Sequence, residues 1–138
     1  MASNVSIARR LASQTWGPVQ FQRKAGPGIW FFSTASHGGY VVDTDIRPIF
    51  KGCEAEVLIR AGGHYLYPDE QHFAVFEEDC EYAKVEWLCP DIFKKMYRSD
   101  DTDLPFDEWV TNRQSELRRS LEQWNPEWLA AHPLPAKE

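Results

Sequence analysis

Apolar residues in the first part of the chain occur in short runs that are rich in β-branched and aromatic side chains. Two such runs, residues 28–32 (GIWFF) and 40–43 (YVVD), flank a segment of small and hydroxylated residues, 33–39 (STASHGG). Runs of this kind are typical of strands, and a Gly-Gly pair accepts the positive backbone angles of a tight turn. The pattern therefore predicts a β-hairpin over 28–34 and 39–43, with Ser36-His37-Gly38-Gly39 at its turn.

Weaker patterns surround this hairpin. Residues 16–22 alternate crudely and predict an edge strand, and residues 64–67 predict a short strand. Residues 54–60 fit either a strand or a helical turn, and residues 72–76 fit either a strand or the approach to a helix. The first half of the chain is therefore expected to form an antiparallel sheet.

The period of the apolar residues changes near position 76. Phe76, Cys80, Ala83 and Trp87 recur at spacings of four, three and four, which places them on one side of a helix. The acidic residues 77–79 would lie in its first turn, where the helix dipole favours negative charge. We predict a helix from Phe76 that ends before the proline at position 90.

Prolines and capping residues mark further helices in the last third of the chain. The pattern predicts a short helix over 90–97, a longer one from a cap at Asp103 to Trp124 with Arg113 on its solvent side, and a last one over 127–132. The whole pattern predicts an α+β fold, an antiparallel sheet from the N-terminal half packed by three or four helices from the C-terminal half.

Length and composition favour one domain. A chain of 138 residues, 43% of them hydrophobic, can bury one core, which we assign to residues 16–132. Residues 1–15 are expected to be a flexible leader, and residues 133–138 a loose tail. No apolar run approaches the roughly 18 residues of a membrane span, and three cysteines without framework spacing favour reduced thiols. We therefore expect a cytoplasmic protein.

Charge is distributed unevenly along the chain. Residues 1–42 hold four basic residues and no acid, whereas residues 43–138 hold all 21 acids and the other eleven basic residues. The acids gather at 77–81 and at 100–108, and such clusters repel phosphates and attract basic protein surfaces. Direct nucleic-acid binding is therefore disfavoured. An alternative is that the two clusters are only a first helical turn and a solvated loop.

His37 is the main candidate for catalysis. If the hairpin turn meets the start of the predicted helix, its imidazole could lie beside Glu77, Glu78, Asp79 or the thiol of Cys80, as general acid–base chemistry requires. The alternative is structural, with His37 acting as a clasp to those carboxylates. No phosphate-binding or dinucleotide motif is present, and the histidines and cysteines are too widely spaced for a common zinc site, so we predict neither metal nor cofactor.

Three stretches of the sequence resemble a known group of proteins. Residues 16–19 (WGPV), 28–39 (GIWFFSTASHGG) and 76–85 (FEEDCEYAKV) resemble an uncharacterised family of small proteins carried by bacteria, plasmids and phages. The resemblance covers about residues 16–97 and brings no settled activity with it. It implies a mobile-element setting, in which small acidic accessory proteins often bind a host defence complex.

These observations favour a non-enzymatic binding protein of a mobile genetic element, an inhibitor of a host defence system of the anti-CRISPR kind. Its acidic and aromatic surface would occupy a basic, nucleic-acid-facing site on a host protein or nucleoprotein complex. The residues expected to contact that partner are Asp100, Asp101, Asp103, Glu77, Glu78 and Trp109. The alternative is a small hydrolase or transferase that uses His37 with a carboxylate from Glu77, Glu78 or Asp79.

Overall fold

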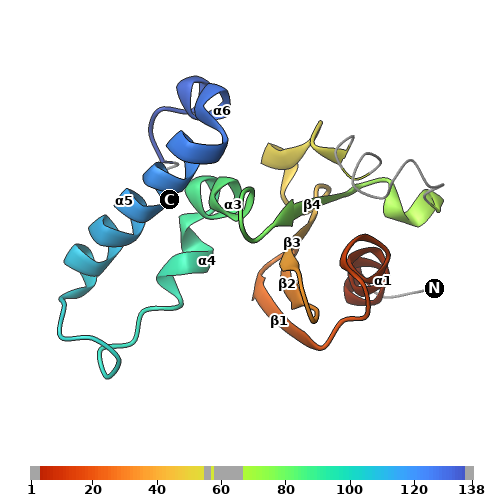
Figure 1. The fold of residues 1–138 in the computed structure, drawn as a ribbon, viewed down its shortest axis with the longest axis horizontal. Helices are drawn as coiled ribbons and strands as arrows, with labels where there is room; N and C mark the ends of the chain where they lie inside the picture. Colours follow the sequence, from red (N-terminus) through yellow and green to blue (C-terminus); the bar gives the residue numbers. More distant parts are fainter. Residues whose placement is uncertain (1–3, 55–56, 58–66, 136–138) are drawn as a thin grey trace. The chain divides into compact units, whose positions relative to one another are not determined.

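A computed structural model describes residues 4–54, 57 and 67–135 of the chain (Figure 1). The chain divides into two compact units, Met1–Glu78 and Asp79–Glu138, which we call the first and second units. Residues 64–66 of the predicted strand over 64–67 and most of the ambiguous segment 54–60 lie outside the described residues. Whether 16–132 acts as a single domain stays a prediction.

The first unit is built on a four-stranded antiparallel sheet. The strands follow one another in chain order, β1 (Phe21–Gly26), β2 (Ile29–Ser33), β3 (Gly38–Asp43) and β4 (Phe73–Glu77) (Figure 1). The predicted hairpin is present as β2 and β3, and residues 72–76 resolve into a strand. With helices in the C-terminal half, the α+β class is confirmed.

The edge strand lies later in the chain than predicted. Residues 16–22 were expected to form it, but β1 begins at Phe21. Pro27 and Gly28 form the two-residue turn into β2, and Gly28 has φ 73°, a backbone angle that glycine adopts without steric cost. The turn chemistry of Pro27-Gly28 therefore decides where β1 ends.

The two glycines at the other hairpin serve the sheet rather than its turn. The turn is closed by Thr34, whose backbone N–H and hydroxyl donate to the carbonyl oxygen of His37 at 2.8 and 3.0 Å. Gly38 and Gly39 are the first residues of β3, and Gly38 has no positive φ. A Cβ at Gly39 would lie 2.1 Å from the carbonyl oxygen of Phe76 in β4, so the close approach of the strands requires glycine there.

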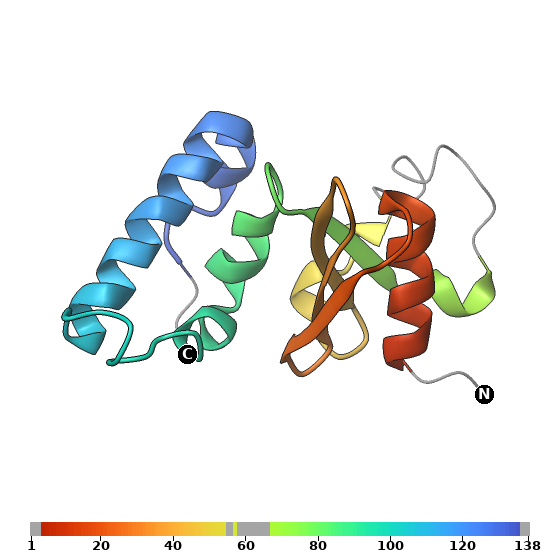
Figure 2. The ribbon, with the colours of Figure 1, turned by 60° about the horizontal axis from the view of Figure 1, so that its bottom comes forward.

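The N-terminal segment is a helix and not a flexible leader. Helix α1 (Asn4–Trp16) buries Ile7, Leu11 and Trp16, which recur at helical spacing and pack in one cluster with residues of β2, β3 and β4. Figure 2 shows the helix lying beside the sheet. Arg10 on the same helix forms ion pairs with Asp69 at 2.7 Å and with the buried Glu70 at 3.1 Å. Burial of this apolar side explains why the segment is ordered.

The second unit consists of four helices in the described part of the chain. These are α3 (Tyr82–Leu88), α4 (Pro90–Lys94), α5 (Phe106–Trp124) and α6 (Pro126–Ala131) (Figure 1). Their shared core contains Ala83, Trp87, Phe93, Leu117, Leu121 and Leu129. The last three helices lie close to where the prolines predicted them. That the C-terminal helices cover the sheet stays a prediction.

The predicted helix from Phe76 begins too early. Phe76 lies in β4, where it pairs with Tyr40 and its ring packs against Phe50 at 5.2 Å, and the helix starts only at Tyr82. Ladder bonding to β3 therefore prevails over the helical spacing at this position. Ala83 and Trp87 are buried on α3, as the same spacing predicted.

Arg113 does not lie on the solvent side of its helix as expected. Its guanidinium donates to both carboxylate oxygens of Glu86, from Nη2 at 2.7 and 2.9 Å and from Nε at 2.9 Å, and Glu86 is 1% exposed. Burial lowers the pKa of Arg113, but the charge and hydrogen bonds of Glu86 outweigh this effect and raise it. The pair therefore joins α3 to α5 as an ionised, bidentate contact.

Within the described residues, no helix has both the length and the apolar character needed to cross a bilayer.

Candidate functional site

The acidic loop, residues 98–104 between α4 and α5, presents the carboxylates predicted to contact a partner. Asp100, Asp101 and Asp103 are all exposed. The backbone beneath them is held by hydrogen bonds, from Asp101 N–H to the carbonyl of Arg98 at 3.0 Å and from Tyr97 hydroxyl to the carbonyl of Leu104 at 2.7 Å. The loop therefore offers negative charge from a fixed backbone.

An aromatic cluster lies at the base of the acidic loop. The ring of Tyr97 packs edge-on against Phe106 at 5.2 Å and against Trp109 at 5.5 Å. Phe106 is 41% exposed, and Trp109 is half-buried with Phe93 behind it at 6.3 Å. Partly exposed aromatic rings beside polar groups are the usual anchors of protein interfaces.

A pocket of about 290 Å³ opens between the loop and α5. Its lining combines an indole, a carboxylate, an amide and a guanidinium, from Thr102, Leu104, Trp109, Asn112, Arg113 and Glu116. Arg113 is already neutralised by Glu86 and by Glu116, whose Oε2 lies 3.3 Å from its Nη1. An indole beside a carboxylate suits a cationic side chain, through cation–π attraction and charge.

The predicted contact residues do not all belong to one unit. Asp100, Asp101, Asp103 and Trp109 lie in the second unit, whereas Glu77 ends β4 and Glu78 follows it in the first unit. Sequence reasoning grouped them by charge alone. The loop with Trp109 is therefore the part of the predicted surface that the structure brings together.

His37 lies beside one of its predicted carboxylates. Its Nδ1 is 3.7 Å from Oε1 of Glu77, and both residues line a shallow pocket of about 160 Å³ with Thr15 and Trp16. The imidazole is 51% exposed. Among the described residues of the first unit, Glu77 forms this ion pair with His37 and the predicted partner Glu78 does not, whereas Asp79 belongs to the second unit. The arrangement is compatible with the structural clasp and with a solvent-exposed acid–base pair.

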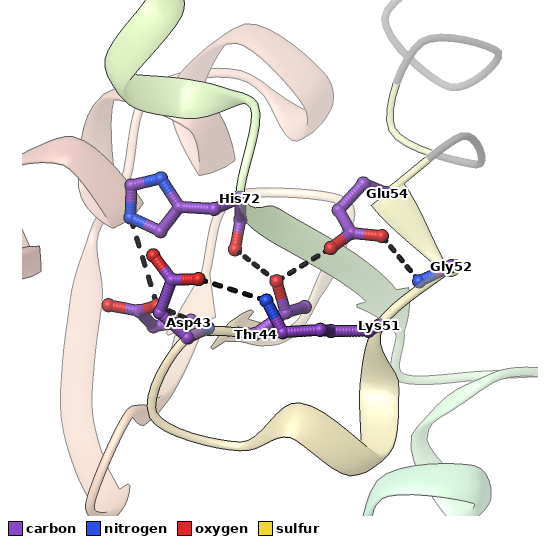
Figure 3. Close-up of polar contacts among 7 residues, drawn as sticks. Asp43, Thr44, Lys51, Gly52, Glu54 and His72 are labelled. Carbon is purple, nitrogen blue, oxygen red and sulfur yellow. Dashed lines mark hydrogen bonds and ion pairs between the residues drawn. The ribbon is translucent and has the colours of Figure 1, made fainter.

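A second polar cluster, which sequence reasoning missed, lies where β3 ends and β4 begins. Asp43 is the last residue of β3, and His72 immediately precedes β4, so the pairing of Asp43 with Phe73 brings the two side chains together (Figure 3). The Nε2 atom of His72 lies 3.7 Å from Oδ1 of Asp43, and Asp45 completes a group of three possible metal ligands.

Thr44 and Glu54 adjoin this cluster. The hydroxyl of Thr44 lies 2.6 Å from Oε1 of Glu54 and 2.8 Å from the carbonyl oxygen of His72, and Gly52 N–H donates to Glu54 at 2.6 Å (Figure 3). Partial burial raises the pKa of Glu54, but the hydrogen bond from Thr44, the backbone N–H donors and the charge of Lys51 together lower it. The signal in the sequence that could have indicated this polar cluster is the triplet Asp43-Thr44-Asp45 at the end of a predicted strand.

The fold and sites together define a small α+β protein with an acidic, aromatic loop. The chain belongs to the family described as domain of unknown function (DUF7007), whose model matches residues 9–136. The match includes the C-terminal helices, which the resemblance over residues 16–97 did not cover. No curated protein and no solved structure matches the chain.

Proposed function

We propose that this chain is a non-enzymatic binding protein that inhibits a host defence complex, in the manner of anti-CRISPR proteins. The observation that carries the proposal is the acidic loop, an ordered segment with three exposed aspartates beside partly exposed aromatic rings and a pocket. Carboxylates held in fixed positions imitate a run of phosphates at low entropic cost. A basic, nucleic-acid-facing surface is therefore the partner that this loop suits best.

The pocket adds a means of choosing among basic partners. A lysine or arginine side chain that entered it would meet the indole of Trp109 and the carboxylate of Glu116. Carboxylates on the loop would contact neighbouring cations at the rim of the same interface. We expect the loop to set the association rate and the pocket to set the lifetime of the complex.

The setting of this function follows from the resemblance and from composition. The motifs of residues 16–19, 28–39 and 76–85 resemble proteins carried by plasmids and phages, and the net charge of −6 has the sign that a basic, nucleic-acid-binding surface attracts. The three cysteines of the sequence lack the spacing of a disulfide framework, which accords with action in the reducing cytoplasm of the host.

Phage infection of a host with active CRISPR immunity tests the proposal. Expression of the protein should restore plaque formation by a targeted phage, and the variant Asp100→Lys/Asp101→Lys should reduce the restored titre about tenfold or more. The matched control is Glu122→Lys/Glu127→Lys, which makes the same charge change at exposed positions of the same unit outside the loop. Equal loss in both variants, or no protection by the wild type across a panel of defence systems, would contradict the proposal.

A second candidate function rests on His37 and Glu77. A carboxylate 3.7 Å from an exposed imidazole, at the edge of a pocket, is the minimum that a small hydrolase or transferase requires. Activity on chromogenic esters and glycosides that disappears in both His37→Ala and Glu77→Gln, with unchanged circular dichroism, would favour this candidate. Full phage protection by the same two variants would exclude it as the basis of the proposed inhibition.

A further inference from the structure

We propose that Asp43, Asp45 and His72 form a binding site for a divalent transition-metal ion, with Mn²⁺ or Zn²⁺ as the expected occupant. One imidazole nitrogen and two carboxylate oxygens from these residues all lie within 4.8 Å of one another. The site belongs to the first unit, whereas the acidic loop belongs to the second.

The distances suit coordination after a small side-chain adjustment. Two ligands at about 2.1 Å from an ion can be separated by at most roughly 4.2 Å. Nε2 of His72 and Oδ1 of Asp43 are 3.7 Å apart, which is within that limit (Figure 3). Asp45 is exposed, so its side chain can rotate the short remaining distance without disturbing the core.

Charge is the second argument for an ion. The side chain of Asp43 is 2% exposed, and among the described residues no lysine or arginine forms an ion pair with it. Its oxygens accept neutral hydrogen bonds, from the amide of Asn4 at 2.8 Å and from the backbone N–H of Asp45 at 3.0 Å. Buried carboxylates are normally paired with a cation or bound to a metal, and a cation beside Asp43 would supply that compensation.

The surroundings hold the proposed ligands in place. Asn4 from α1 donates to Oδ2 of Asp43, while Oδ1 accepts from the backbone N–H of Asp45 and lies on the side of His72. The backbone N–H of Thr44 donates to the carbonyl of His72 at 2.9 Å, which locks the ends of β3 and β4 together. Supporting hydrogen bonds of this kind orient metal ligands in known sites.

Lys51 would compete with the ion for the carboxylate of Asp45. Its Nζ lies 3.1 Å from Oδ1 of Asp45, and both side chains are more than half exposed. An exposed pair of this kind is weak, so a divalent ion can displace the ammonium group from the carboxylate. Removal of Lys51 should therefore strengthen metal binding, an effect that simple damage to the protein would not produce.

The donor set decides which ions are expected. An imidazole with two carboxylates suits Mn²⁺ and Zn²⁺, whereas Mg²⁺ and Ca²⁺ prefer oxygen ligands alone. Three protein ligands leave further coordination positions for water. Mn²⁺ is the more useful probe because its unpaired electrons broaden the signals of nearby nuclei.

Calorimetric titration of the metal-stripped full-length protein with MnCl₂ and with ZnCl₂ tests the site. We expect one ion per chain, with affinity at least tenfold weaker in Asp45→Asn and in His72→Gln, and about tenfold weaker in Asn4→Ala. Lys51→Met should bind more tightly than the wild type. In nuclear magnetic resonance spectra, Mn²⁺ should broaden the amide signals of Asp45 and His72 at the lowest metal concentrations.

Glu54→Gln is the matched control, because it removes a neighbouring carboxylate that is not among the proposed ligands. It should leave the stoichiometry and the broadening pattern unchanged. Failure of the wild type to bind either ion with a dissociation constant below about 1 mM would overturn the site. Wild-type affinity in both Asp45→Asn and His72→Gln would overturn it as well.

Discussion

The role of each carboxylate in this protein depends on its burial and its hydrogen-bond partners rather than on the charge of its neighbours in the sequence. Glu86 is buried and satisfied by Arg113, Asp43 is buried among neutral donors, and Asp100 is exposed on a loop. Sequence reasoning treated acids chiefly as surface charge, which is accurate for the loop but not for Asp43, Glu70 or Glu86, which are buried. Burial is what separates a structural or ligand-binding carboxylate from a solvated one.

Glu54 provides a prediction at this scale. Because its pKa is lowered in the folded state, its ionised form contributes stability that is present above its unfolded pKa of about 4.3 and is lost as the pH falls through the folded value. Glu54→Gln should therefore lower the free energy of unfolding by about 1 kcal/mol at pH 7 and by less in acid. Urea denaturation at a series of pH values measures the difference, and a constant difference across the series would contradict the assignment.

Elements of the first unit are joined by close backbone contacts as much as by apolar packing. Strands β3 and β4 approach so closely at Gly39 that a Cβ would lie 2.1 Å from the carbonyl oxygen of Phe76. Helix α1 then covers the sheet with Ile7, Leu11 and Trp16. The hairpin motif of the sequence is therefore a feature of strand packing, whatever further role His37 has.

Substitution of Gly39 tests this view. Gly39→Ala should destabilise the protein by about 3 kcal/mol, because the strands must separate to accept the methyl group. The control is Gly17→Ala, where the added Cβ meets open space and only the φ of 102° is strained, at a cost of about 1 kcal/mol. Chemical denaturation of both variants measures the loss in the free energy of unfolding. An equal loss in Gly39→Ala and Gly17→Ala would show that packing at Gly39 is unimportant.

At the scale of the whole molecule, each unit has a hydrophobic cluster of its own. The first unit centres on the sheet and α1, and the second on Trp87, Phe93 and Leu117. Side-chain hydrogen bonds also close the second unit, from Trp87 Nε1 to the carbonyl of His132 at 2.9 Å and from Asn125 to the carbonyl of Cys80 at 2.6 Å. The proposed partner loop and the proposed metal site lie in different units.

Residues 79–138 should consequently fold when expressed alone. We expect a helical circular dichroism spectrum and cooperative thermal unfolding with a low melting temperature, since a 60-residue unit has only a marginal core. Under the proposed function, this fragment should retain the sensitivity of partner binding to Asp100→Lys/Asp101→Lys. A fragment without helical signal or cooperative melting would show that the second unit depends on the first.

The sequence by itself determined the elements whose signals are local. The β2–β3 hairpin follows from adjacent β-branched and aromatic runs, and the starts of α4 and α6 follow from Pro90 and from Asn125-Pro126. The exposure of the aspartates in the acidic loop could also be predicted, because burial of several adjacent charges costs too much free energy.

Only the tertiary structure decided the features that depend on distant contacts. The ordering of α1 requires the sheet that it covers, and the strand at Phe76 requires pairing with Tyr40 across a long connection. The meeting of Asp43 with His72 likewise depends on the register of β3 with β4. Such contacts arise from pairing energies between segments far apart in the chain, which local periodicity and composition do not contain.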